Sequence, residues 1–186
     1  DGHVAIANSL ALRLAGITKD SPNPATGEIE RDASGEPTGM LKEGGAMSLV
    51  FRKVPGLSAE QRRRGIQLAL AEVASLGVTS IQDNSGWTDF QTYEELKKEG
   101  KLTARISEWL PFTAPLAQLE EMRKHGGTTD PWLRTAGLKG VVDGALGGRT
   151  AAMLAAYSDQ ASTSGILNIP EERLKQLVVE RDAAGF

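Results

Sequence analysis

The chain has 186 residues, of which 40% are hydrophobic and 24% charged, and its formal net charge at pH 7 is −3. These values are typical of a globular chain with one sizeable core, and neither a basic block nor an apolar run of membrane-spanning length stands out. The sequence contains no cysteine, which excludes disulfides, thiolate metal sites and a cysteine nucleophile. We therefore expect a cytoplasmic protein that binds neither nucleic acid nor membranes.

Residues 1–56 have an irregular pattern. Either Asn8 or Ser9 predicts the cap of a short helix through Leu14, which Gly16 would end in the left-handed conformation. The stretches 28–32 and 36–41 flank a turn and predict a small hairpin. Because this hairpin is largely polar, we expect residues 1–56 to form an irregular excursion that carries the hairpin on its surface.

Residues 57–186 alternate between helices and strands. Ser58 and Gln61 form a capping box that opens the first helix, and Gly77 ends it. Such alternation predicts parallel strands covered by helices, and the repeat of roughly 25–35 residues fits the βα units of a barrel. Three strands cannot close an eight-stranded barrel, so the expected fold is α/β, a partial (β/α)8 TIM barrel that forms a fragment of a larger domain. The remaining elements follow in order: strands at 78–82, 104–110 and 138–142, helices ending at Gly100 and Gly126, and a last helix from Pro170 to Ala184.

Functional side chains of parallel α/β folds gather at the carboxyl ends of the strands. The three predicted strands end near Asp83, Trp109 and Asp143. Lys139 is a charged residue on a short apolar strand, and the alternation of side chains places it on the same face as Asp143. If that face looks into a barrel, both side chains point toward a catalytic centre.

Each of these residues also has an ordinary structural interpretation. Lys139 could be a strand-edge lysine with its ammonium group in water, and Arg149 could form a surface ion pair. Asp143 could close a turn in which the following glycine takes a positive φ. His125 lies in the last turn of a helix, where a histidine complements the helix dipole. The glycines after Asp143 match no phosphate-binding fingerprint, so a nucleotide-binding domain is not favoured.

Four stretches of the sequence resemble one family. Residues 138–152 (Leu-Lys-Gly-Val-Val-Asp-Gly-Ala-Leu-Gly-Gly-Arg-Thr-Ala-Ala), the opening Asp1–Ser9, and residues 35–39 with 77–83 are similar to the YtcJ-like branch (amidohydrolase family 3) of the metal-dependent amidohydrolase superfamily. They occur in the family's order along nearly the whole chain. Gly148 departs from the family, in which a serine is more frequent at this position.

The resemblance implies a metal-dependent hydrolase that cleaves C–N bonds of small amide-type or formamide-type molecules. It implies a divalent metal cofactor, zinc, with one or two ions, and a strand lysine that becomes a carboxylysine bridging them. The residues that carry these roles are Lys139 as metal ligand, Asp143 as catalytic residue, and His3, Asp83, Trp109 and Arg149 as substrate contacts. For His3, a local hydrogen-bonding role is the alternative.

A non-catalytic barrel relative that acts as a binding or regulatory protein is the alternative function. Of the family's metal ligands only the lysine maps onto the chain, whose two histidines are His3 and His125. We therefore expect the chain by itself to be inactive. An incomplete barrel leaves sheet edges and apolar faces uncovered, so we also expect association into a homo-oligomer.

Overall fold

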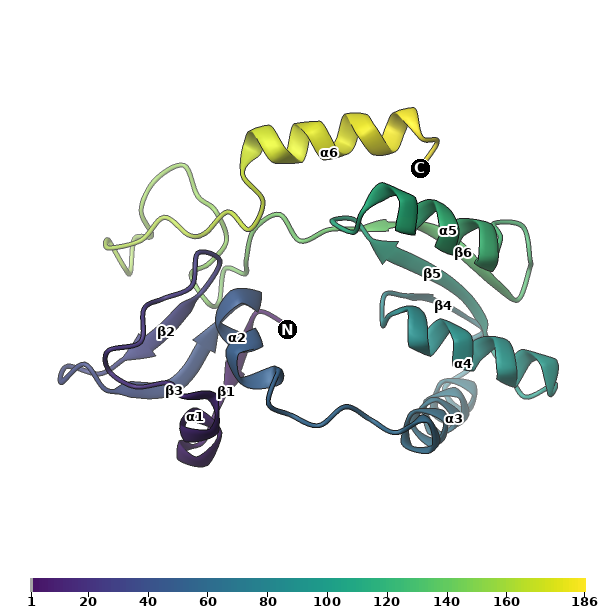
Figure 1. The fold of residues 1–186 in the computed structure, drawn as a ribbon, viewed down its shortest axis with the longest axis horizontal. Coiled ribbons are helices and arrows are strands. Elements are labelled where there is room, and N and C mark those ends of the chain that lie inside the picture. The colour runs from purple at the N-terminus through teal and green to yellow at the C-terminus, as the bar shows by residue number, and fades with distance from the viewer. Residues whose placement is uncertain (1) are drawn as a thin grey trace. The chain divides into compact units, whose positions relative to one another are not determined.

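The computed structural model describes residues 2–186, so Asp1 lies outside the described residues. The chain divides into two compact units (Figure 1). Unit 1 comprises residues 1–56 and 141–174, and unit 2 comprises residues 57–140 and 175–186. The sequence pattern also changes after Gly56, whereas residues 141–174, expected among the βα units, belong to unit 1. None of the helices within residues 2–186 has the length and apolarity needed to cross a membrane.

Unit 1 is built on a three-stranded antiparallel sheet with the strand order β1-β3-β2. The predicted hairpin is confirmed, and Asn8 caps the first helix by accepting a hydrogen bond from the Ala11 N–H at 2.9 Å. Neither β1 nor α2 was predicted, because β1 has three residues and two glycines weaken the helical signal of α2. The elements are β1 (Val4–Ile6), α1 (Ser9–Ala15), β2 (Glu28–Arg31), β3 (Pro37–Lys42) and α2 (Glu43–Phe51).

The hairpin carries the core of unit 1, so the expectation of a surface excursion is wrong. Ile29 and Leu41 are each 1% exposed and pack with Ala46 of α2. The first turn of α2 approaches the chain before β2 closely, since a Cβ at Gly45 would lie 2.4 Å from the Thr26 carbonyl oxygen. The polar residues of the hairpin alternate with these buried ones, and this alternation made the hairpin look like a surface element.

Unit 2 contains a three-stranded parallel sheet with the order β4-β5-β6. The predicted alternation of helices and parallel strands is confirmed, and Ser58 and Gln61 form the predicted capping box. The last helix begins in unit 1 and continues in unit 2. The elements are α3 (Ala59–Ser75), β4 (Ser80–Asp83), α4 (Trp87–Lys98), β5 (Arg105–Pro111), α5 (Leu116–Gly126), β6 (Leu133–Lys139) and α6 (Glu171–Ala183).

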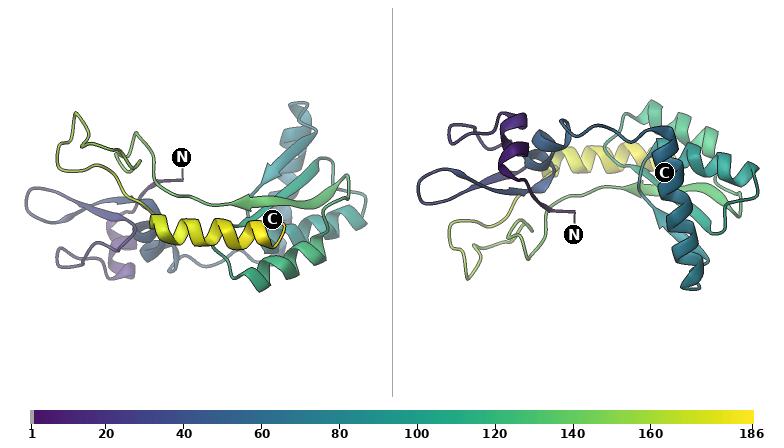
Figure 2. Two further views of the ribbon diagram at one scale, coloured as in Figure 1. Left: turned by 90° about the horizontal axis from the view of Figure 1, so that it is seen from above. Right: turned by 90° about the horizontal axis from the view of Figure 1, so that it is seen from below.

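One face of the parallel sheet is covered by α3, α4 and α5 (Figures 1 and 2). Ile106 of β5 packs with Phe90 and Leu96 of α4, and Leu110 packs with Leu119 of α5. Because successive side chains of a strand point to opposite faces, the residues between Ile106 and Leu110 alternate between this covered face and the other. The face opposite the helices is called the helix-free face below.

The third parallel strand starts earlier than predicted. The strand expected at 138–142 is β6, Leu133–Lys139, so that prediction is wrong. Polar residues and Gly137 interrupt the apolar pattern, but pairing with β5 extends the strand over them, from Leu133 opposite Ile106 onward. Lys139 is therefore the last residue of the strand and Asp143 is not on it. The predicted shared strand face of these two residues does not exist.

Candidate functional site

The six predicted site residues divide between the two units. The substrate candidates His3 and Arg149 belong to unit 1 together with Asp143. Asp83, Trp109 and Lys139 belong to unit 2. The chain therefore holds two local polar sites, one in each unit.

Lys139 lies at the carboxyl end of β6 on the helix-free face. The register places Gly137 opposite Trp109 and Lys139 opposite Pro111. Leu138 packs against the helix-side core near α5, so alternation directs Lys139 to the other face, together with Trp109. Both side chains are exposed, Trp109 at 37%. This end of a parallel strand is where α/β folds carry their functional side chains.

Asp83, at the end of β4, points to the covered face of the sheet. The Tyr93 hydroxyl of α4 donates a hydrogen bond to Asp83 Oδ2 at 2.6 Å, and the Ser85 hydroxyl donates to the same oxygen at 2.7 Å. Burial and the Asp83 carboxylate raise the pKa of Tyr93, so its phenol remains a hydrogen-bond donor. Asp83 thus lies against α4, away from the face that carries Trp109 and Lys139.

Beside Asp83 lies a buried acid that the sequence analysis missed. Glu108 is the β5 partner of Asp83 in the sheet and is 1% exposed. Its Oε1 accepts the Gly86 N–H at 3.3 Å, and within residues 2–186 its buried Oε2 has no hydrogen-bond partner. Desolvation, and then the negative charge of Asp83, raise the pKa of Glu108 to about 8. Glu108 is therefore protonated at neutral pH.

In unit 1 the polar site is centred on the buried carboxylate of Glu43, which is 1% exposed. Its Oε1 accepts the Thr150 hydroxyl at 2.5 Å, and its Oε2 accepts the Asn168 side-chain amide at 3.3 Å. The Nδ1 atom of His3 lies 3.2 Å from Oε1 and 3.1 Å from Oε2. One carboxylate thus joins four segments that are distant in the sequence, and we call these four residues the Glu43 cluster.

The Glu43 cluster leaves no room for a side chain at Gly144. A Cβ there would lie 2.1 Å from Thr150 Oγ1 and 2.4 Å from Glu43 Oε1. Thr150 Oγ1 also accepts the Ala145 N–H at 3.0 Å, so the loop folds back onto the threonine directly after this glycine. The glycine of the Asp-Gly pair is therefore required by a close approach of side chains, and its φ is not positive.

Asp143 contributes its backbone to the cluster and its carboxylate to the loop. The Asn168 amide that reaches Glu43 also donates to the Asp143 carbonyl oxygen at 3.1 Å. Asp143 Oδ2 accepts the Ala152 N–H at 3.0 Å. Asp143 is therefore brought to the same cluster as His3 through its backbone carbonyl.

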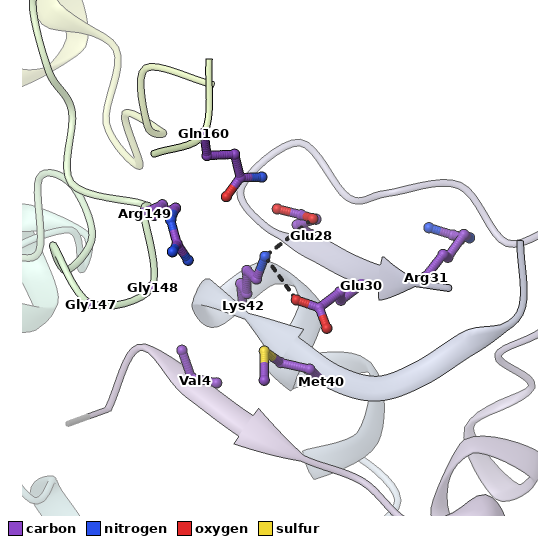
Figure 3. A pocket seen from close by; sticks show the side chains of 10 residues that line it. All are labelled: Val4, Glu28, Glu30, Arg31, Met40, Lys42, Gly147, Gly148, Arg149 and Gln160. Atoms are coloured by element: carbon purple, nitrogen blue, oxygen red, sulfur yellow. Dashed lines mark hydrogen bonds and ion pairs between the residues drawn. The ribbon is translucent and has the colours of Figure 1, made fainter. Parts of the chain in front are cut away.

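Arg149 lines a groove of about 700 Å³ between the antiparallel sheet and the 147–149 loop (Figure 3). On the sheet side, the Lys42 Nζ lies 3.3 Å from Glu28 Oε1 and 3.2 Å from Glu30 Oε2. Arg149 has a φ of 54° and pairs with Asp159 at 2.8 Å, which matches the ion pair considered as its structural role. The groove is polar, and Lys42 is paired with two acids of the sheet that also line it.

Glu43 is the central residue of unit 1, and the sequence analysis did not identify it. The one local signal is that two charged residues, Lys42 and Glu43, follow directly on an apolar strand end. The partners of Glu43 lie 40, 107 and 125 residues away, so no local spacing pattern connects them.

The donor side chains of the described residues decide whether they could hold a metal ion. Residues 2–186 contain no group of three or more His, Cys, Asp or Glu side chains that could hold a metal ion. Lys139 remains as a single candidate ligand, and a divalent ion in a protein needs several. The described residues therefore do not by themselves fit a metal centre.

Comparison with known proteins identifies the family. Residues 1–186 match the model of the Amidohydrolase family over their whole length. The chain belongs to this family. It is 32% identical to the protein LONG AFTER FAR-RED 3 of Arabidopsis thaliana, covering 100% of the chain and 34% of the relative. It is also 32% identical to a protein of Bacillus subtilis (strain 168) that is named as the amidohydrolase YtcJ. That alignment covers 95% of the chain and 34% of the relative.

Solved structures agree with this assignment. The chain resembles an uncharacterized metal-dependent hydrolase from Pyrococcus horikoshii OT3 with a TM-score of 0.66 and 26% identity. That match covers 99% of this chain and 36% of the other. This amidohydrolase chain thus spans about a third of the length of the relatives it matches.

Gly144→Ala tests the close packing around Glu43. Because the new methyl group overlaps two side-chain oxygens, we expect the variant to lose about 1–3 kcal/mol of unfolding free energy in urea denaturation. Gly147→Ala is the matched control in the same loop, since nothing lies within 4 Å of its Cβ position, and it should change stability by less than about 0.5 kcal/mol. Equal stability of the two variants would contradict this packing.

Glu108→Gln tests the buried acid of unit 2. Between its ordinary pKa of 4.5 and its folded pKa of about 8, Glu108 keeps a proton that the unfolded chain releases. The free energy of unfolding therefore falls as pH rises through this window, by up to about 1.4 kcal/mol per pH unit, and this fall ends above pH 8. A glutamine does not ionise, so the variant should gain stability relative to wild type from pH 5 to 8.5.

The matched control for this titration is Glu120→Gln, which makes the same change at an exposed position of α5. It should follow the wild-type pH profile. A constant difference between Glu108→Gln and wild type at every pH would show that Glu108 is ionised in the folded chain.

Proposed function

We propose that the protein is a metal-dependent hydrolase that cleaves the C–N bonds of small amide-type molecules. The observation that carries this proposal is the match of the whole chain to the Amidohydrolase family, together with its likeness to solved metal-dependent hydrolases. The choice of C–N bonds is supported by the N-substituted formamide deformylase of Arthrobacter pascens, to which the chain is 37% identical over 84 residues. That alignment covers 44% of this chain and 16% of the deformylase.

The parallel sheet of unit 2 supports the proposal that the chain forms a sector of a (β/α)8 barrel. Its strands follow one another in sequence order, each reached through a helix on the same face of the sheet. That arrangement is the repeating unit of a barrel, whose interior faces away from its helices. The helix-free face with Trp109 and Lys139 would then be the interior face at the catalytic end.

Lys139 is the residue of this chain that we assign to the metal site. We propose that its amino group is carboxylated and that the ion is zinc, with one or two ions bound. A bound divalent ion supplies a water of lowered pKa and polarises the scissile carbonyl. The further ligands would have to lie outside residues 2–186, because these hold no suitable cluster.

The other predicted site residues take substrate roles in this proposal. Trp109 offers an aromatic surface beside Lys139, and His3 offers an imidazole held by Glu43. Arg149 lines the groove of unit 1, and Asp143 remains the proposed catalytic carboxylate. Asp83 would act through α4, which it contacts. We also propose that copies of the protein associate through uncovered sheet edges.

Lys139→Met tests the metal assignment. Methionine keeps the length of the side chain but cannot be carboxylated, so we expect loss of bound metal and a fall in hydrolysis of an N-substituted formamide of at least about 100-fold. Elemental analysis and a product assay measure the two effects on the intact enzyme, because the chain by itself is expected to be inactive. The matched control is Lys124→Met, at an exposed position of α5, which should retain both.

Two results would overturn the assignment. Full metal content in Lys139→Met would remove the lysine from the metal site. A metal-free wild-type protein that binds small molecules but hydrolyses nothing would support the alternative function. That alternative is a barrel relative with a binding or regulatory role.

A further inference from the structure

We propose that Glu43 is a positioning residue that keeps a proton on Nδ1 of His3 and so fixes the orientation of the imidazole ring. The inference rests on the proposed hydrolase function for the identity of the substrate. Its structural basis is confined to unit 1 and to the Glu43 cluster.

The direction of the hydrogen bonds around Glu43 follows from the chemistry of its partners. An ionised carboxylate only accepts hydrogen bonds. The Asn168 side chain reaches Oε2 through its amide nitrogen, which only donates. The Thr150 hydroxyl lies 2.5 Å from Glu43 Oε1 and 3.4 Å from the Ala145 carbonyl oxygen, so its hydrogen is directed to the nearer acceptor, Glu43. Both oxygens of the buried carboxylate thus receive donors.

His3 contributes the third donor. Its Nδ1 lies within 3.2 Å of both carboxylate oxygens, and a nitrogen lone pair at this place would face two negative oxygens. A hydrogen is therefore on Nδ1. A carboxylate that fixes the tautomer of a histidine in this way also fixes the orientation of the ring.

The backbone anchors the same pair. The Glu43 N–H donates to the His3 carbonyl oxygen at 2.7 Å, next to the pairing of Val4 with Lys42 between β1 and β3. The His3 side chain is 24% exposed and that of Glu43 is 2% exposed. The imidazole is thus partly exposed, whereas Glu43 is covered and acts only through its neighbours.

The conformation of Glu43 supports a role beyond packing. Its φ is 63°, a region that costs conformational energy for any residue other than glycine. The next residue is Gly44, so the chain places a glutamate, and not a glycine, at the left-handed position. The carboxylate is the feature that a glycine would lack, and it makes every side-chain contact of the cluster.

The tautomer of His3 can be measured without any activity assay. In protein labelled with ¹⁵N-histidine, two-bond ¹H–¹⁵N correlation spectra distinguish Nδ1–H from Nε2–H rings at a pH where the imidazole is neutral. The chain has two histidines, and His125→Gln assigns the signals. We expect His3 to be predominantly the Nδ1–H form in wild type. A predominantly Nε2–H ring would overturn the inference.

Glu43→Gln tests the cause. The glutamine amide can turn its own N–H groups toward His3, so we expect the Nδ1–H population to fall several-fold and kcat/KM for an N-substituted formamide to fall about 10–100-fold. The matched control is Glu36→Gln, an exposed position between β2 and β3, which should leave both unchanged. An unchanged His3 tautomer in folded Glu43→Gln would reduce Glu43 to a structural role and contradict the inference.

The two proposals fail in different ways. If the hydrolase proposal is wrong, no formamide is cleaved, but the wild-type tautomer and its dependence on Glu43 persist. If the positioning inference is wrong, Lys139→Met still abolishes metal binding and activity, while the His3 tautomer does not respond to Glu43→Gln.

Discussion

The burial of one carboxylate constrains unit 1 more than any other interaction. Removing a charged group from water is costly unless hydrogen bonds replace its hydration, and Glu43 obtains these from His3, Thr150 and Asn168. These donors come from both parts of the unit, so residues 141–174 fold onto the hairpin sheet around this group. Figure 2 shows this segment, green to yellow-green, running beside β2 and β3. The glycine at position 144 and the short side chain of Thr150 meet the same requirement, because the loop must approach the Glu43 carboxylate closely.

The family-like stretch 138–152 divides between the two units. Lys139 ends a strand of the parallel sheet, where α/β enzymes carry their chemistry, and the residues from Asp143 onward form the loop around the Glu43 cluster. Membership of the amidohydrolase family explains why both parts are chemically distinctive. In the proposed enzyme the strand end supplies a metal ligand, and the loop packs against the Glu43 cluster, in which Glu43 contacts His3.

Local signals in the sequence predicted local structure well. The capping box at Ser58, the cap at Asn8 and the alternation of helices with parallel strands depend on residues within a few positions of one another. Features fixed by distant contacts were not predictable: β6 begins at Leu133 because its partner strand is present, and Glu43 is important because residues more than 100 positions away donate to it. His3 and Lys139 were selected through the family resemblance, which carries tertiary information that spacing lacks.

The central claim is that the Glu43 carboxylate and its donors hold the two parts of unit 1 together. A double-mutant cycle with Glu43→Gln and Thr150→Val, measured as unfolding free energy in urea, isolates the contact between residues 107 positions apart. A hydrogen bond to a charged, buried partner predicts a coupling energy of about 1.5–3 kcal/mol. A coupling within about 0.5 kcal/mol of zero would contradict the account.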